Sequence, residues 1–155
     1  MSQDKNVCSN LEIENFYPET NEHLKELLNM QADIQQGTYG TKYTEMTLEE
    51  IKNFWLVNNH ALVDELHEMM DALGGVHDGI GNAVWKFWKG KNKLASKMKI
   101  KDLSERDLLE LKFEIVDMLH FFLNYAGSIG MTAEEMYNMY MAKNKENRRR
   151  QKEGY

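Results

Sequence analysis

Several features are scarce in this sequence of 155 residues, and each absence excludes a class of protein. Cys8 is the single cysteine, so no intrachain disulfide can form, and this usage suits a reducing cytoplasm. Pro18 is the single proline, so helices can run long without interruption. The first residues lack the apolar stretch of a secretory signal, and the longest mostly apolar segment, 118–131, is too short to span a bilayer. We therefore expect a cytoplasmic protein with no membrane partner.

An excess of basic residues is also absent. The formal net charge is −6, which argues against a general nucleic-acid binder, because binding to a polyanion is driven by cations that replace condensed counterions. The charge is unevenly spread, however, and six of the ten residues in 143–152 are lysine or arginine. We expect no nucleic-acid partner, and the basic end of an acidic chain needs another explanation.

The hydrophobic pattern predicts helices, because no useful stretch shows the alternation of a half-buried strand. The length fits a single domain over 1–155, with a loosely packed segment at 1–18 and a basic segment at 143–155. Two capping boxes, Thr47 with Glu50 and Thr132 with Glu135, mark helix starts. We predict an all-α antiparallel bundle of about five helices. Their ranges are 19–36 (ending before Gly37), 47–74, 82–98, 104–129, and 132 into the basic segment.

Four acids interrupt the apolar pattern of two of these helices. Glu65 and Glu68 lie on the apolar stripe of the second helix, and Glu114 and Asp117 lie in 113–125, which is apolar on almost every face and should be a central helix. A buried, unpaired carboxylate costs several kcal/mol, and two such pairs would repel each other. A hard divalent cation removes both penalties, and oxygen ligands favour Mg²⁺, with Mn²⁺ as a possible substitute. We therefore predict a metal site formed by the two pairs.

Each part of this pattern has a plainer interpretation. Glu65 and Glu68 taken alone are typical of a solvated helix surface, and the inner pair could form salt bridges with lysines. Asp117 and His120 form a D-x-x-H motif that, beside E-x-x-E, resembles carboxylate-bridged di-iron bundles. Those proteins need an E-x-x-H motif from each of two helices, and no E-x-x-H is present in this sequence, so we interpret His120 as a hydrogen-bonded core residue.

The basic segment has two interpretations as well. It could be a solvated helix end whose cations complement the helix dipole. Alternatively, Lys143, Asn147 and Arg150 fall on one helical face and could hold the oxygens of a triphosphate beside the metal. In the third helix Trp85 and Trp88 are typical of core or interface, while Lys89 could face the phosphates.

Four segments resemble, in this order, the dimeric all-α dUTPase family, a branch of the all-α nucleoside triphosphate pyrophosphatase superfamily that also contains MazG. They are 65–68, 85–89, 113–117, and 143–151 followed by Gly154 and Tyr155. The resemblance runs from about Thr47 to the end of the chain and is strongest to the phage members that act on dCTP and dUTP. It implies a homodimer that converts a nucleoside triphosphate to the monophosphate and pyrophosphate.

The resemblance also implies roles for particular residues. Glu65, Glu68, Glu114 and Asp117 would bind Mg²⁺, and one of the first two would orient or deprotonate the attacking water. The phosphates would be held by Lys143, Asn147, Arg150 and Lys89.

The pyrimidine pocket departs from the dUTPase pattern. Gln31 matches the family glutamine, whereas Gln35 stands where asparagine is usual, and we place Trp55 in the same pocket. A longer amide that can flip suits a site that accepts cytosine as well as uracil, so the prediction is cleavage of dCTP and dUTP. Exposed aromatic residues, among them Trp55, Trp85 and Phe121, would help to cover the partner subunit.

Three other functions remain open on the sequence alone. A strict dUTPase or a MazG-like enzyme for other triphosphates would use the same acids. A non-catalytic helical interaction domain would pair them with lysines, and a di-iron protein would bind iron.

Overall fold

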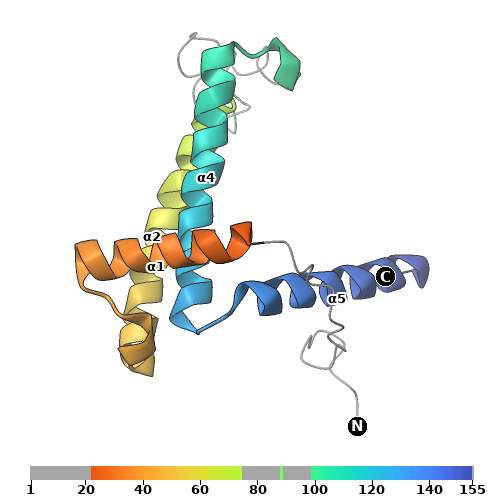
Figure 1. Ribbon diagram of the computed structural model, residues 1–155. Helices are drawn as coiled ribbons and strands as arrows, with labels where there is room; N and C mark the ends of the chain where they lie inside the picture. The colour runs from red at the N-terminus through yellow and green to blue at the C-terminus, as the bar shows by residue number, and fades with distance from the viewer. Residues whose placement is uncertain (1–21, 75–87, 89–98, 155) are drawn as a thin grey trace.

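The computed structural model describes residues 22–74, 88 and 99–154 (Figure 1). In this part of the chain there are four α-helices, two single-turn 3-10 helices and no strand, so the predicted all-α fold is confirmed. The α-helices are α1 (His23–Tyr39), α2 (Leu48–Ala72), α4 (Glu105–Ser128) and α5 (Ala133–Lys152), and the 3-10 helices are η2 (Tyr43–Glu45) and η3 (Ile100–Asp102). The helix predicted over 82–98 lies outside the described residues, apart from Trp88, which is exposed.

The helix starts are where the capping residues predict them. The Thr47 Oγ1 accepts from the Glu50 N–H at 3.3 Å, and the Glu50 carboxylate accepts from the Thr47 N–H at 2.8 Å. Thr132 and Glu135 repeat the arrangement at the start of α5. Each box satisfies backbone donors that a helix N-terminus otherwise leaves unpaired. The two capping boxes are therefore confirmed.

The predicted end of the first helix before Gly37 is wrong. Helix α1 continues through Gly37 to Tyr39, and the chain turns at Gly40, which has a φ of 68°. The Gly40 N–H bonds to the Gln36 carbonyl at 3.1 Å, which closes the helix in the left-handed conformation that glycine adopts without strain. The sequence offers two glycines three residues apart, and the second one ends the helix.

Helices α2 and α4 form the antiparallel pair on which the rest of the structure is built. The Trp55 Nε1 donates to the Ser128 Oγ at 2.8 Å and the Asn124 Nδ2 donates to the Asn58 Oδ1 at 3.1 Å, so residue numbers rise along one helix as they fall along the other. Helix α1 crosses this pair, and α5 leaves the end of α4 and runs outward to the C-terminus (Figure 1). The antiparallel arrangement thus holds for α2 and α4, whereas α1 is a crossing helix.

The apolar surface of α4 is only partly covered within one chain. Phe113 and Phe122 are each 56% exposed, and Ile115 and Val116 are exposed as well. Helix α4 is the central helix, as predicted, because it packs against both α1 and α2, but one of its sides is open in the described part of the chain.

Candidate active site

Three of the four predicted acids meet between α2 and α4. Glu65, Glu68 and Glu114 each offer a carboxylate oxygen, and these oxygens all lie within 4.8 Å of one another. The antiparallel pairing brings the C-terminal half of α2 beside the N-terminal half of α4, and the i, i+3 spacing puts both glutamates of α2 on the side that faces Glu114. We call these three residues the acidic cluster.

The acidic cluster lacks compensating positive charge in the part of the chain that the structure describes. Glu114 is only 7% exposed, and its buried Oε2 has no hydrogen-bond partner. Burial raises the pKa of Glu114, and repulsion from Glu68 and Glu65 raises it further. The pKa of Glu65 is raised in the same way, by burial first and then by Glu68 and Asp117. The free energy of this arrangement favours either bound protons or a bound cation.

Asp117 lies at the edge of the acidic cluster rather than within it. Its charge contributes to the raised pKa of Glu65 and of Glu114, although its oxygens do not belong to the group of three. The ion pairs among the described residues lie elsewhere, for example Lys25 with Glu22 at 3.4 Å. Salt bridges to lysines, the plainer interpretation of these acids, are absent from the acidic cluster as far as the described residues go.

A second polar group lies between α1, α2 and α4, and we call it the amide relay. The His120 Nδ1 lies 2.7 Å from the Gln31 Oε1, and the Gln31 Nε2 donates to the Asn124 Oδ1 at 2.8 Å. The Asn124 Nδ2 donates to the Asn58 Oδ1, and the Tyr43 hydroxyl donates to the Asn124 Oδ1 at 2.6 Å. With these amide orientations the Gln31 Oε1 accepts and the His120 Nδ1 donates, so the tautomer of His120 and the orientations of the amides depend on one another.

Tyr43 is fixed in the relay by close packing. Burial raises the pKa of its hydroxyl to about 12, so the hydroxyl stays protonated and can donate. Its ring lies 5.9 Å from the ring of Phe54 and passes so close to Gly127 that a Cβ there would lie 2.5 Å from the Tyr43 Cε2. A glycine at 127 is therefore what allows Tyr43 to reach Asn124.

The residues predicted for the pyrimidine pocket lie in or near this region. Gln31 and Gln35 are the two buried residues of α1, and Gln31 has both ends of its amide engaged in the relay. Trp55 is hydrogen-bonded to Ser128 and packs edge-on against Tyr125 at 5.7 Å. The ring of Trp55 is thus part of the contact between α2 and α4. His120 is hydrogen-bonded as expected, but at the surface rather than in the core.

The predicted phosphate-binding residues are not next to the acidic cluster within one chain. Lys143, Asn147 and Arg150 lie on α5, which packs against α1 and runs away from α2 and α4 (Figure 1). The Arg150 Nε donates to the Glu146 Oε1 at 2.7 Å, and Glu146 also binds Arg149. Lys89 and Trp85 lie outside the described residues. The phosphate-binding role of these side chains stays a prediction.

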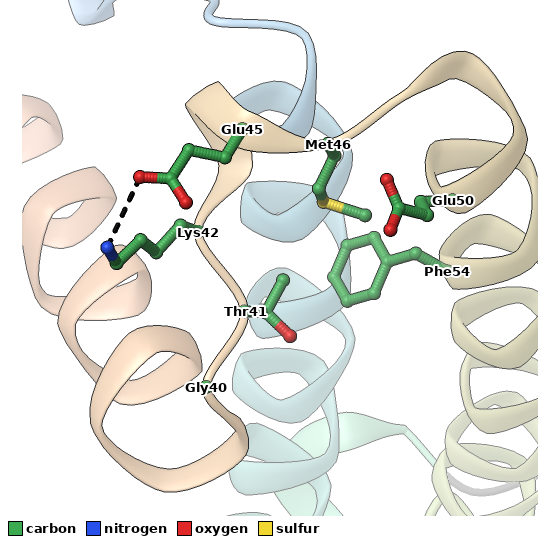
Figure 2. Close-up of a pocket in the computed structure, with 7 residues that line it drawn as sticks. All are labelled: Gly40, Thr41, Lys42, Glu45, Met46, Glu50 and Phe54. Atoms are coloured by element: carbon green, nitrogen blue, oxygen red, sulfur yellow. Dashed lines mark hydrogen bonds and ion pairs between the residues drawn. The ribbon is translucent and has the colours of Figure 1, made fainter.

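A pocket of about 400 Å³ opens at the other end of α2 (Figure 2). Its lining comes from the turn after α1, from η2 and from the start of α2. Lys42 is paired with Glu45 at 3.2 Å, and Glu50 is the capping residue of α2. The charged groups of this pocket thus already have structural partners, and it lies about four helical turns from Glu65.

Comparison with known proteins places the chain in a family. It is 44% identical over 104 residues to the dCTP pyrophosphatase of Enterobacteria phage LZ5, a match that covers 65% of this chain and 60% of that protein. It is 36% identical over 126 residues to the dCTP pyrophosphatase of Enterobacteria phage T4, covering 80% and 73%. The chain belongs to the dCTP pyrophosphatase family.

The other comparisons add less to the family assignment. A DNA replication protein of Enterobacteria phage T4 is 34% identical over 116 residues, which are 74% of this chain and 29% of that protein. The chain spans less than two thirds of the LZ5 relative. No protein-family model matches, and no solved structure matches significantly. None of the described helices is apolar enough over a sufficient length to cross a membrane.

Sequence reasoning missed Asn58, Asn124 and Tyr43. Both asparagines are buried and lie on the faces that carry the acids, since Asn58 precedes Glu65 by seven residues and Asn124 follows Asp117 by seven. A polar side chain two helical turns from a buried acid, in an otherwise apolar stripe, was the available signal. Tyr43 had no such signal, because its place depends on the turn between α1 and α2.

Proposed function

We propose that this chain hydrolyses dCTP, and dUTP as well, to the nucleoside monophosphate and pyrophosphate. The observation that carries the proposal is the acidic cluster, in a chain that belongs to the dCTP pyrophosphatase family. A helical scaffold has no need of three carboxylates held together, with the pKa values of Glu65 and Glu114 raised.

The acidic cluster fits Mg²⁺, with Mn²⁺ as a substitute. Glu65, Glu68 and Glu114 would hold the ion, and Asp117 would bind at its edge. The donors are all carboxylate oxygens, which a hard cation prefers, and the unpartnered Glu114 Oε2 is the kind of atom that a cation would satisfy. No histidine belongs to this group in the described part of the chain, which weighs against di-iron chemistry. When bound, the ion would neutralise phosphate charge and position the reactants.

The chain's own residues would carry the proton transfer. The oxygen of a water forms a bond to phosphorus while the bond from that phosphorus to the oxygen of the leaving group breaks. One of Glu65 and Glu68 orients this water and accepts its proton.

The phosphates would be held by Lys143, Asn147, Arg150 and Lys89. In one chain the α5 residues lie away from the acidic cluster, so this assignment requires either a movement of α5 or a contribution from a second chain.

We also propose that the chain forms a homodimer. The open side of α4 carries Phe113, Val116 and Phe122, and apolar residues of α2, among them Leu56 and Val63, are exposed too. Exposed apolar surface of this extent favours a protein partner, and a second copy offers the same surface. Light scattering after gel filtration should give twice the mass of one chain, and a monomer would contradict the proposal.

A substrate panel tests the proposed reaction. Each deoxy- and ribonucleoside triphosphate is incubated with the chain and Mg²⁺, and the products are separated. We expect the monophosphate and pyrophosphate from dCTP and dUTP, with dATP and dGTP poor substrates. Release of orthophosphate alone would reject the proposal, and cleavage of dUTP without dCTP would reduce it to a strict dUTPase.

A further inference from the structure

The amide relay ends in one atom that the fold leaves unsatisfied. Among the buried side-chain nitrogens and oxygens of the described residues, the Asn58 Nδ2 is the one nitrogen without a hydrogen-bond partner. Asn58 is 4% exposed, so water does not hydrate this donor. A buried donor left unpaired is costly, and such groups are found where a ligand completes the bond.

With the His120 Nδ1 protonated, the relay leaves over a donor rather than an acceptor. The Asn58 Oδ1 accepts from the Asn124 Nδ2, while the Asn124 Oδ1 is already occupied by Gln31 and Tyr43. Turning the Asn58 amide over would bring its N–H groups against those of Asn124. The free N–H groups of Asn58 are thus held in one orientation by three neighbouring helices and η2.

The position of Asn58 matches the far end of a nucleotide bound at the acidic cluster. Asn58 and Glu65 are seven residues apart on α2, which is two helical turns, or about 10.5 Å along the axis, on one face. A nucleotide whose phosphates lie at the acidic cluster extends its sugar and base by a distance of that order. The base would therefore arrive at the level of the relay.

The free N–H of Asn58 determines which kind of atom of the base it can bind. An N–H donor needs an acceptor, and cytosine and uracil differ at ring positions 3 and 4 but share the carbonyl oxygen O2. We propose that the Asn58 Nδ2 donates a hydrogen bond to O2 of the pyrimidine, and that Asn124 and Gln31 are positioning residues for this contact. The proposal rests on the proposed function and adds a base-reading residue to it.

The contact accounts for acceptance of both pyrimidines. A donor at O2 binds cytosine and uracil equally, so that discrimination between them must come from elsewhere in the pocket. A donor held in place by the relay also loses little conformational freedom on binding, which favours affinity.

Isothermal titration in the presence of Mg²⁺ tests the contact, with dCMP, dUMP and inorganic pyrophosphate as probes. Asn58→Asp keeps the acceptor for Asn124 and replaces the donor with an oxygen. We expect the Kd of dCMP and that of dUMP to rise by about tenfold or more, and the Kd of pyrophosphate to stay unchanged. Asn58→Ser, which also lacks the amide donor, should behave in the same way if the buried charge prevents the Asp variant from folding.

Asn59→Asp is the matched control, because Asn59 is exposed, accepts a hydrogen bond from Tyr125 at 2.7 Å, and lies outside the relay. It should bind all three probes as the wild type does. Unchanged binding of dCMP and dUMP by both Asn58 variants overturns the inference, and so does an equal loss of pyrophosphate binding or a loss confined to one pyrimidine. Wild-type chain that binds dCMP but releases no pyrophosphate from dCTP would refute the proposed function alone.

Discussion

The acidic cluster and the amide relay both place polar side chains between α2 and α4, but they differ in how the cost of burying those side chains is offset. The acidic cluster brings like charges together, and burial and repulsion raise the pKa of Glu65 and Glu114. Two helical turns away, the amide relay pairs donors with acceptors among neutral groups and leaves the one nitrogen of Asn58 over. Helices α2 and α4 carry side chains of both regions, while α1 and η2 contribute to the relay alone.

The contrast separates two requirements of a nucleotide site. Charges that destabilise one another in the free protein can be strongly stabilised by a cation, so the acidic cluster depends on a ligand. The hydrogen bonds of the relay hold its side chains in place without a ligand, and the Asn58 Nδ2 is the buried nitrogen that they leave over. The experiments below perturb one region and measure whether the other responds.

Glu114→Gln should have the largest effect. Removing one carboxylate from the acidic cluster should lower pyrophosphate release by more than about 100-fold, because loss of outer-shell partners alone costs a metal site 10–100-fold. The metal-free variant should melt about 2–4 °C higher, corresponding to about 1 kcal/mol of relieved repulsion. An assay of pyrophosphate release measures the first effect, and thermal melting with and without Mg²⁺ measures the second. A variant that is still stabilised by Mg²⁺ like the wild type would show that Glu114 is no ligand.

The effect of Mg²⁺ on stability should depend on pH. The pKa values of Glu65 and Glu114 are raised above their ordinary 4.5, so the folded chain holds these protons more tightly than the unfolded chain. The metal-free chain therefore gains stability as pH falls through the raised pKa values and loses it as pH rises. Mg²⁺ must displace these protons. Below the raised pKa values its apparent affinity should therefore fall by about tenfold for each unit that the pH is lowered and for each proton displaced.

Melting curves at pH 5 and pH 7 check this dependence. The rise in Tm caused by Mg²⁺ should be larger at pH 7. An equal rise at both values would mean that the acidic cluster is already ionised without the metal.

Gly127→Ala perturbs the relay without touching an acid. The new Cβ would lie 2.5 Å from the Tyr43 Cε2, so Tyr43 must move away from Asn124. We expect a loss of about 1–3 kcal/mol of stability, measured by chemical denaturation. Gly37→Ala is the control, because nothing lies within 4 Å of that Cβ and an alanine inside α1 should stabilise by about 0.5–1 kcal/mol. An unchanged Mg²⁺ response in the first variant would show that the two regions act independently.

Thr132→Ala should have the smallest effect. It removes the hydroxyl that accepts from the Glu135 N–H at 3.1 Å and should cost about 1 kcal/mol through α5. Thr132→Ser keeps the hydroxyl and should cost less. Neither variant should alter the Mg²⁺ response or the dCMP affinity in titrations. A change in either quantity would mean that α5 is coupled to α2 and α4.

Local sequence patterns predicted the helices and the acidic cluster, whereas the end of α1 and the amide relay could not be predicted from such patterns. The capping boxes at Thr47 and Thr132 act within four residues, and the i, i+3 pairs act within one turn, so the sequence alone shows them. The end of α1 at Gly40 depends on which of two glycines takes a positive φ, and periodicity does not distinguish them. The amide relay joins residues more than 60 positions apart, and no helical period relates Gln31 or Asn58 to Asn124.

Helix α1 has an unusual inward face. Its two buried residues are glutamines, while Leu27, Met30 and Ile34 are exposed. Its other leucines, Leu24 and Leu28, are half-buried, so no apolar side chain of α1 is fully buried against the pair of long helices. Hydrogen bonds contribute only about 0.5–1.5 kcal/mol each to such docking. Local opening at α1 should therefore be easier than separation of α2 from α4. Transient detachment of this one helix would let a base pass in and out while Glu65, Glu68 and Glu114 keep their places between α2 and α4.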